Sequence, residues 1–577
     1  MKKELKKFKQ KIITYKYYKF ELVFLGATIL AIFFCMLPAI RTAGWPHGTD
    51  FDNKTQLYAK HIKEGDFIPI WSSDDAYGMG SPLPTFYHKT FYYISGTALV
   101  ITNSVKLSIL MSIGLFMLVG TYGMRFCLRK MTEHKIFIVL ASQTILFANY
   151  TFTNWLVRDD MAEFAAMMIV PWLIWWCLKL LKEKKFSYSI APIMFFLINA
   201  HNVIALFGLI PAAIAYLVFL MKEKLEGFYR TIKPALISVG ILMVLLLPLL
   251  ILEKLFLRYY DPSKITQAGY LASSNFHPFY DYLLHPHYIW LNASTDLTVQ
   301  IDFGITIPLV IILLGLLIDL FSFSKLGHFT RKLKGKLGVF LLASMTIFIL
   351  LQLKISGTLY EHLKFMQFLQ FPWRLLTYIT VLGIIFIAYA TTRYNNKLFL
   401  NIFSIVWLGS FVLLSPVFKT VQHGYTTTRQ FSYRAPVEQK TGTGSMMGIG
   451  EYLPRVYKDG AELKSLEVAS LYGEKFNDDK ETELIKGGPC TIQSPTNNMY
   501  ESMSFTTIIR CDTKSLVALP ISFNDFTTIQ DIKSGERITY RRMDKEDPRI
   551  IITVPANKKL NLLVSLPTVP RIIKKLL

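Results

Sequence analysis

Two aspartates early in the chain, Asp50 and Asp52, can handle protons or metal ions. They follow a long apolar run by about ten residues. A carboxylate near a membrane surface can accept the proton of an incoming hydroxyl group or help to hold a divalent cation. The alternative is structural, because Asp is favoured at the N-cap of a helix and a helix is predicted from about Lys54. The sequence leaves both interpretations open.

A second ionisable group is the string Arg158-Asp159-Asp160, which is followed by Glu163 at the start of another apolar run. Helical spacing puts Glu163 on one turn with the two aspartates. Ionisable side chains at such a depth are costly and tend to face a cavity or a partner. Arg158 can pair with these carboxylates, or its planar guanidinium can bind a phosphate. A functional site and a capped helix with a structural ion pair both fit the string.

Two further polar groups lie where apolar runs begin or meet. His201-Asn202 separates two runs, and a single histidine there is either structural or part of a site. Trp373 and Arg374 end a Gln-Phe-Pro-Trp-Arg string that opens a later run. Trp is common at membrane interfaces, whereas Arg374 can extend to the surface or hold an anionic lipid phosphate.

These residues must be positioned by membrane-spanning helices. Hydrophobic residues make up 52% of the 577 residues, and the mean hydropathy is +0.35. Apolar runs of about 20 residues are long enough to cross a bilayer. We therefore predict an α-helical polytopic membrane protein with a C-terminal β-rich domain. Its eleven predicted spans are 20–40, 105–127, 136–152, 161–181, 187–200, 203–221, 234–256, 304–323, 337–353, 372–392 and 398–418.

Basic residues set the predicted orientation, because short cytoplasmic loops are rich in Lys and Arg. The basic leader 1–19 is placed in the cytoplasm, and the first span is a retained anchor. The transmembrane domain then covers 20–418, with long outer loops 41–104 and 257–303, and the domain 419–577 lies outside. Five basic segments fall inside: 125–135, 182–185, 222–233, 325–336 and 393–397.

The predicted outer domain contains two cysteines, Cys490 and Cys511. An oxidising compartment would allow them to form a disulfide, although the sequence does not decide whether they do. Short β-branched segments separated by turn residues favour a small β-sandwich for this domain.

The alternation brings the polar groups to one level, at the outer face. A lipid-linked phosphate substrate requires that location, because its headgroup lies there while its tail stays in the hydrocarbon. The net charge of +23 is concentrated in short loops, without the basic stripe that nucleic-acid binding needs. The chain also has no phosphate-binding P-loop, no spacing for a structural zinc site and no serine-elbow motif.

A series of short motifs runs from Trp45 into the tail: Gly48-Thr49-Asp50, Gly65–Trp71, Tyr77–Pro82, Phe86-Tyr87, Arg158 with Ala162-Glu163, Pro171-Trp172, His201-Asn202, Gln370–Arg374 and Glu451–Pro454. In this order the motifs resemble the YfhO-like bacterial membrane proteins, some of which are labelled 6-pyruvoyl-tetrahydropterin synthase-related. Nothing in these residues indicates pterin chemistry. The resemblance implies a C-type glycosyltransferase (GT-C) fold, which takes a polyprenyl-phosphate sugar on the outer face. It also implies a catalytic Asp in the first outer loop, which is Asp50 here, with Asp52 as second choice.

We therefore expect a glycosyltransferase of the bacterial cytoplasmic membrane. It would move a sugar, with inversion, from undecaprenyl phosphate to a cell-envelope glycopolymer such as a teichoic acid or surface polysaccharide. A divalent cation is compatible with this chemistry, but no ligand set requires one. The residues expected to bind substrate are Arg158, Asp159, Glu163, His201, Asn202, Trp373 and Arg374.

Two other functions compete with the enzyme. One is a transporter or scaffold for lipid-linked glycans, and the other is a receptor whose tail domain binds a ligand. A transporter needs polar residues through the middle of its spans, where this sequence is overwhelmingly apolar. The pattern therefore favours an enzyme at the outer face.

Overall fold

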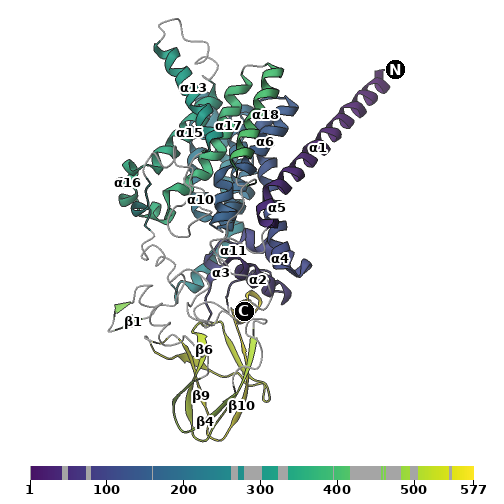
Figure 1. Ribbon diagram of the computed structural model, residues 1–577. Helices are drawn as coiled ribbons and strands as arrows, with labels where there is room; N and C mark the ends of the chain where they lie inside the picture. The colour runs from purple at the N-terminus through teal and green to yellow at the C-terminus, as the bar shows by residue number, and fades with distance from the viewer. Residues whose placement is uncertain are drawn as a thin grey trace. The chain divides into compact units, whose positions relative to one another are not determined.

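The computed structural model consists mostly of helices, with a β-rich C-terminal region (Figure 1). It describes residues 2–41, 50–72, 80–158, 160–260, 271–277, 302–321, 335–393, 396–415, 417, 457–458, 461–462, 483–493, 504–544, 547 and 549–576. The chain divides into two compact units. Unit 1 comprises Met1–Gly48, Ile113–Met243 and Asn275–Arg429, and unit 2 comprises Thr49–Ser112, Val244–Ser274 and Gln430–Leu577.

Long apolar helices dominate the part of the chain before the β-rich region. Several are joined by single turns of 3-10 or π helix, among them η2 (Thr144–Phe147), η3 (Thr153–Val157) and η8 (Pro372–Leu375). The described α-helices of this part are α1 (Lys2–Arg41), α2 (Asp50–Lys63), α3 (Leu83–Phe86), α4 (Thr90–Thr102), α5 (Val105–Arg129), α6 (Lys135–Gln143), α7 (Asn149–Phe152), α8 (Met161–Glu183), α9 (Ile190–Ala200), α10 (Asn202–Phe207), α11 (Leu209–Phe256), α13 (Phe303–Phe321), α15 (Lys336–Gln352), α16 (Gly357–His362), α17 (Leu376–Thr392) and α18 (Lys397–Leu414).

Six helices in the described part of the chain are long and apolar enough to cross a membrane, or up to eight if each of two bent pairs forms one span. The predicted span 187–200 falls on α9, which has only 11 residues. The predicted spans 203–221 and 234–256 fall in one stretch, Asn202–Phe256, which is interrupted at Lys224 by non-helical dihedral angles. The apolar helices are compatible with a membrane protein, and the number eleven stays a prediction.

Helices α8 and α17 show how local sequence sets where a long apolar helix begins and ends. The Asp160 carboxylate accepts a hydrogen bond from the Glu163 N–H at 2.9 Å, so it caps the first turn of α8. The helix ends at Lys184, whose positive φ of 55° turns the chain away. Its 23 residues span about 34 Å. Helix α17 follows Arg374 closely and ends at Thr392, with Arg393 at its C-cap.

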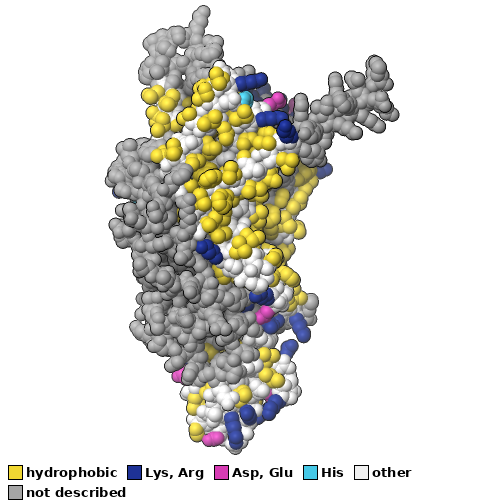
Figure 2. Space-filling model, turned by 45° about the vertical axis from the view of Figure 1, so that its right-hand side comes forward, with side chains coloured by type: hydrophobic (Ala, Val, Ile, Leu, Met, Phe, Trp, Pro, Cys, Tyr) yellow, Lys and Arg dark blue, Asp and Glu magenta, His cyan; other side chains and the backbone are white. Residues whose placement is uncertain are grey.

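Four of the five predicted inside segments meet in unit 1. Lys130 forms an ion pair with Glu183. Glu223 lies 3.0 Å from the Lys184 ammonium and 3.3 Å from that of Lys336. Figure 2 shows Lys and Arg side chains beside a broad field of hydrophobic side chains. These contacts bring the four segments together at one end of the helical bundle, while their side of a membrane stays a prediction.

In unit 2, helix α2 packs closely on α4. A side chain at Gly96 would bring its Cβ within 2.6 Å of the Tyr58 Cβ, so only glycine fits at this crossing. Thr55 and Ser95 share a hydrogen bond of 2.9 Å across the same contact. The buried His61 ring then joins α2 to the following loop, with 2.7 Å contacts to Asp66 and to the Trp71 carbonyl.

The β-rich region contains two four-stranded antiparallel sheets. The first has the order β4-β5-β10-β7 and the second the order β3-β6-β9-β8. Buried residues of both sheets, such as Ile509 and Val517, form one cluster that also includes Trp71 and Phe256. The strands are β3 (Glu483–Lys486), β4 (Cys490–Gln493), β5 (Ser504–Cys511), β6 (Ser515–Ser522), β7 (Thr528–Asp531), β8 (Tyr540–Arg542), β9 (Arg549–Val554) and β10 (Lys559–Ser565), besides the short pair β1 (Tyr457–Lys458) and β2 (Ala461–Glu462).

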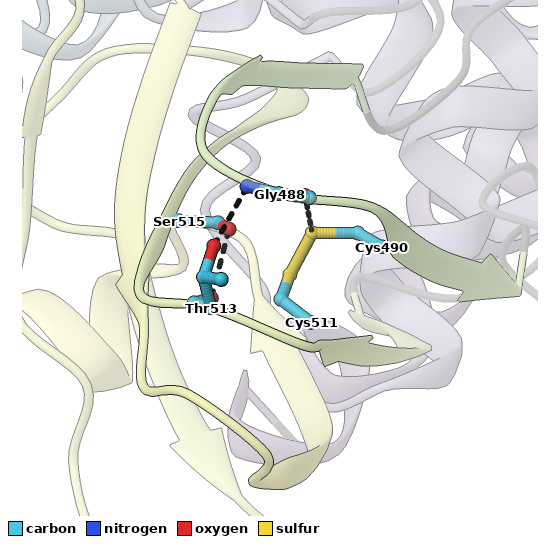
Figure 3. Close-up of a disulfide and its surroundings, with 5 residues drawn as sticks. All are labelled: Gly488, Cys490, Cys511, Thr513 and Ser515. Atoms are coloured by element: carbon cyan, nitrogen blue, oxygen red, sulfur yellow. Dashed lines mark hydrogen bonds between the residues drawn. A yellow bond between two sulfur atoms is a disulfide. The ribbon is translucent and has the colours of Figure 1, made fainter.

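Cys490 and Cys511 form a disulfide between neighbouring strands (Figure 3). They are direct partners in the β4–β5 ladder, and their Cα atoms are 4.0 Å apart. The adjoining turn is held by a hydrogen bond of 2.7 Å from the Gly488 N–H to the Thr513 hydroxyl. The pairing that the sequence left open is therefore present.

Candidate functional site

Four ionisable side chains form a compact cluster in unit 1. Asp160 and Glu163 lie at the start of α8, Arg158 lies just before them, and Arg374 lies in η8. The Nη2 atoms of Arg158 and Arg374 lie 3.3 and 3.4 Å from the same oxygen, Oδ2 of Asp160. Glu163 Oε2 is shared in the same way, at 2.9 Å from Arg158 Nη1 and 3.2 Å from Arg374 Nε. Two guanidiniums thus face two carboxylates.

Neighbouring polar groups support the Glu163 carboxylate and the Arg158 guanidinium. The Tyr150 hydroxyl donates a hydrogen bond of 2.5 Å to Glu163 Oε1. Arg158 Nη1 also donates to the Asn154 side-chain oxygen at 3.1 Å. Both supporting residues are buried. The sequence analysis missed them, because Tyr150 and Asn154 lie at the end of an apolar run where polar residues attract little notice.

The chain around Arg374 is arranged to hold its guanidinium. Arg374 Nη1 donates to the Gln370 side-chain oxygen at 2.9 Å and to the Leu369 carbonyl at 3.2 Å. Gln370 has a φ of 60°, which L-residues rarely adopt, and such strain concentrates at functional sites. The Arg374 guanidinium also lies 5.2 Å from the Phe371 ring centroid, and that ring stacks on Trp373.

Electrostatics favour the charged forms of Asp160 and Arg158. Burial disfavours the charged form of Asp160, but the charges of Arg158, Arg374 and His201 outweigh burial and hold its pKa well below the usual range. Burial likewise disfavours a charged Arg158, yet Glu163 and its neighbours raise the Arg158 pKa above its ordinary value. The formal charges of the two arginines and two carboxylates therefore cancel.

His201 completes the group from a different helix junction. It is buried between α9 and α10, and its Nδ1 accepts a hydrogen bond of 3.3 Å from the Ile204 N–H. Ligand atoms of Asp160, Glu163 and His201 all lie within 4.8 Å of one another. This triad has the donor types of a metal site, but both carboxylates already face two guanidiniums. A divalent cation would have to compete with these two guanidiniums for the same carboxylate oxygens and would be repelled by them.

The remaining predicted site residues are distributed as follows. Asn202 is exposed at the start of α10, and Trp373 is buried beside Phe371. Asp50 and Asp52 open helix α2, which belongs to unit 2. Their side chains, like the whole of Asp159, lie outside the described residues. The structure thus brings together Arg158, Glu163, His201 and Arg374 from the predicted set, and adds Asp160.

No known protein family matches the chain, and no curated protein matches it.

Proposed function

We propose that the protein is a GT-C-type membrane glycosyltransferase with eleven spans. It transfers a sugar from a polyprenyl-phosphate donor to a cell-envelope glycopolymer. The observation that carries the proposal is the pairing of Arg158 and Arg374 on shared carboxylate oxygens. Their guanidiniums are the groups that would hold the donor phosphate.

The number of N–H groups on the two guanidiniums supports phosphate binding. Each Nη2 atom carries two N–H groups, and Asp160 Oδ2 accepts one from each. The second N–H of each Nη2 therefore has no acceptor among the residues that the structure describes. A phosphate can accept from both arginines at once, with the planar geometry that guanidinium groups favour.

The position of the site along the helices fits a lipid-linked ligand. Arg158 and Arg374 lie at the beginnings of the apolar stretches Met161–Glu183 and Pro372–Thr392. A bilayer changes from hydrocarbon to headgroups at such a point. A polyprenyl phosphate has its charge at that depth and its chain in the hydrocarbon. A soluble sugar nucleotide has no apolar part that would need this location.

The proposed reaction has four bonding changes. The acceptor hydroxyl oxygen attacks the anomeric carbon, and the bond from that carbon to the phosphate oxygen breaks. Asp50 takes the hydroxyl proton, and polyprenyl phosphate leaves with the bonding electrons. Attack from the face opposite the phosphate inverts the anomeric centre. Arg158 and Arg374 offset the charge that grows on the leaving phosphate. The role of Asp50 rests on its position in the first outer loop and on the resemblance.

We further propose a bacterial cytoplasmic membrane location, with the basic leader inside and the β-rich domain outside. The Cys490–Cys511 disulfide supports an outside domain, because disulfides persist in oxidising compartments. The β-rich domain would bind the acceptor polymer. The buried Glu163 and His201 would position the sugar donor. The exposed Asn202 would contact the donor where it enters the site.

The test measures sugar transfer from a labelled polyprenyl-phosphate sugar in membranes that contain the full-length protein. Arg374→Ala should raise the KM for the donor at least tenfold and leave the KM for the acceptor nearly unchanged. Asp50→Asn should lower kcat by two orders of magnitude or more, as expected for loss of a general base. Full activity in a well-expressed Asp50→Asn protein would remove this residue from the mechanism.

A matched control and a competing outcome complete the experiment. Arg541→Ala removes an exposed arginine of the β-rich domain and should leave the donor KM unchanged. A transporter would move the labelled lipid across vesicle membranes without consuming it. Transport without any transfer product would overturn the enzyme and support that alternative.

A further inference from the structure

A second charged cluster in unit 1 is centred on Glu223 of α11. Its carboxylate meets three cations from three elements. Lys184 at the end of α8 and Lys336 at the start of α15 lie 3.0 and 3.3 Å from Oε1, and Arg230 lies 3.4 Å from Oε2. One negative charge thus holds three positive charges together, which leaves a local excess of two.

Two more cations extend this excess along the same end of the bundle. Lys182 interacts repulsively with Lys130 and Arg393. Arg393 donates a hydrogen bond of 2.7 Å to the Tyr389 hydroxyl, which is neutral. Neither Lys182 nor Arg393 forms an ion pair within the described part of the chain. The basic cluster is therefore defined by Lys130, Lys182, Lys184, Arg230, Lys336 and Arg393.

The acids near the basic cluster do not balance it. Glu183 pairs with Lys130, and Glu223 serves three cations. Counting also Glu133 and Glu226, which lie near Lys130 and Arg230 in the sequence, six cations and four acids leave two positive charges. The sequence from Ser322 to Lys334 contains four more Lys or Arg residues and no Asp or Glu. General membrane orientation explains basic loops, but it does not require their side chains to converge on one carboxylate.

Apolar side chains beside the cluster indicate what kind of anion it fits. Met221, Leu225 and Tyr229 flank Glu223 in the sequence and are 80%, 71% and 71% exposed. Nearby in the chain, Lys179 lies over the Trp175 ring at 5.2 Å, and Trp side chains favour the headgroup level of a membrane. A free phosphate would use only the cations, whereas a phospholipid would also cover the apolar surface.

We propose that the basic cluster is a binding site for the phosphate headgroup of an anionic phospholipid. The headgroup lies against Lys182, Lys336 and Arg393, and the acyl chains lie along the exposed apolar residues of α11. Basic pockets between helices at the cytoplasmic end are suited to such lipids. The site is independent of the proposed sugar transfer, because α8 and α17 each run from the arginine cluster to this opposite end.

The experiment uses the full-length protein in a zwitterionic detergent. Phosphatidylglycerol, phosphatidylcholine and soluble glycerol phosphate are titrated in separate arms. Bound lipid is counted by native mass spectrometry, and thermal unfolding is followed in parallel. Phosphatidylglycerol should bind and raise the Tm, whereas the other two should not. An equal effect of glycerol phosphate would overturn the lipid and indicate a free phosphate site.

Charge-matched variants separate a built site from diffuse attraction. Lys182→Gln with Arg393→Gln should weaken phosphatidylglycerol binding at least tenfold. Lys354→Gln with Lys364→Gln removes the same charge from exposed positions outside the basic cluster and should leave binding unchanged. Equal losses in the two double variants would reject a specific site. If the first variant is unstable, Lys182→Arg with Arg393→Lys keeps the charge and should retain binding.

Discussion

Arg158 and Arg374 direct their Nη2 atoms at one oxygen of Asp160, although the second contact joins residues 214 positions apart. Two guanidiniums repel each other at this distance, so their proximity depends on Asp160 and Glu163. Breaking a buried pair of this kind is strongly destabilising because it leaves an uncompensated charge. The two carboxylates therefore keep the two cations adjacent in the folded protein.

Asp160→Asn should therefore destabilise the protein and make it more responsive to phosphate ligands. We expect a loss of about 3–5 kcal/mol, because two guanidiniums then face one carboxylate. Added polyprenyl phosphate should restore more stability to the variant than to the native protein, because its charge replaces that of Asp160. Thermal unfolding in detergent with and without the lipid measures both effects. The exposed Asp512→Asn is the control, and an equal lipid effect in all three proteins would contradict the site.

Tyr150→Phe should weaken the same cluster without changing its charge. The hydroxyl donates to a carboxylate, and hydrogen bonds to charged groups contribute about 1.5–3 kcal/mol. We expect that loss in the unfolding free energy, together with a higher KM for the donor. Tyr378→Phe removes a hydroxyl that donates to the neutral Ile204 carbonyl and should leave the donor KM unchanged. Matching KM values for the two variants would argue against a role for Tyr150.

The sequence predicted part of the site because charged residues at span ends are conspicuous. Arg158, Glu163 and Arg374 stand out there, and helical spacing linked Glu163 to Asp160. The shared carboxylate oxygens were not predictable, because they depend on how α8 packs beside η8. The β-branched segments expected to form strands were 504–510, 515–521, 537–541 and 549–554, and β5, β6, β8 and β9 overlap them in turn. Strand β10 was missed, although its buried Leu560, Leu562 and Val564 alternate with less buried residues, as in a strand with one face in the core.

Asp302 should make stability fall as the pH rises. Burial raises its pKa to about 7, although a hydrogen bond from the Asn149 N–H opposes the shift. The folded protein then keeps a proton that the unfolded chain releases near pH 4. The contribution of protonated Asp302 to the free energy of unfolding is complete below about pH 4. It falls by about 1.4 kcal/mol per pH unit above that and is lost as the pH rises through about 7.

The corresponding test compares Asp302→Asn with the native protein by thermal unfolding at pH 5 and pH 8. The variant cannot ionise at this position, so its stability should fall less between the two values. Asp512 is exposed, and Asp512→Asn should keep the native dependence. A native slope in Asp302→Asn would show that another group is responsible.

Loss of the disulfide should destabilise the β-rich domain. Cys490 and Cys511 are 21 residues apart, and opening a loop of that size costs about 3 kcal/mol in the chain-entropy account. The double variant Cys490→Ser with Cys511→Ser should match the native protein treated with a reductant. Reductant should then have no further effect on the variant, because Cys35, Cys127 and Cys177 are free. Unfolding of the full-length protein under both conditions measures this, and a reductant effect of equal size in the variant would contradict it.

The triad of Asp160, Glu163 and His201 should bind a divalent metal only after the arginines are neutralised. In the native protein the guanidiniums already compensate both carboxylates, so chelator treatment should change sugar transfer less than twofold. Arg158→Gln with Arg374→Gln leaves two carboxylates and an imidazole within 4.8 Å, which is a usable ligand set for Zn²⁺. Calorimetric titration with Zn²⁺ should therefore detect binding in the double variant and not in the native protein. His201→Ala added to that variant should weaken the gained affinity. Stoichiometric Zn²⁺ binding by the native protein, together with loss of transfer in chelator, would instead identify the cluster as a metal centre that the arginines serve.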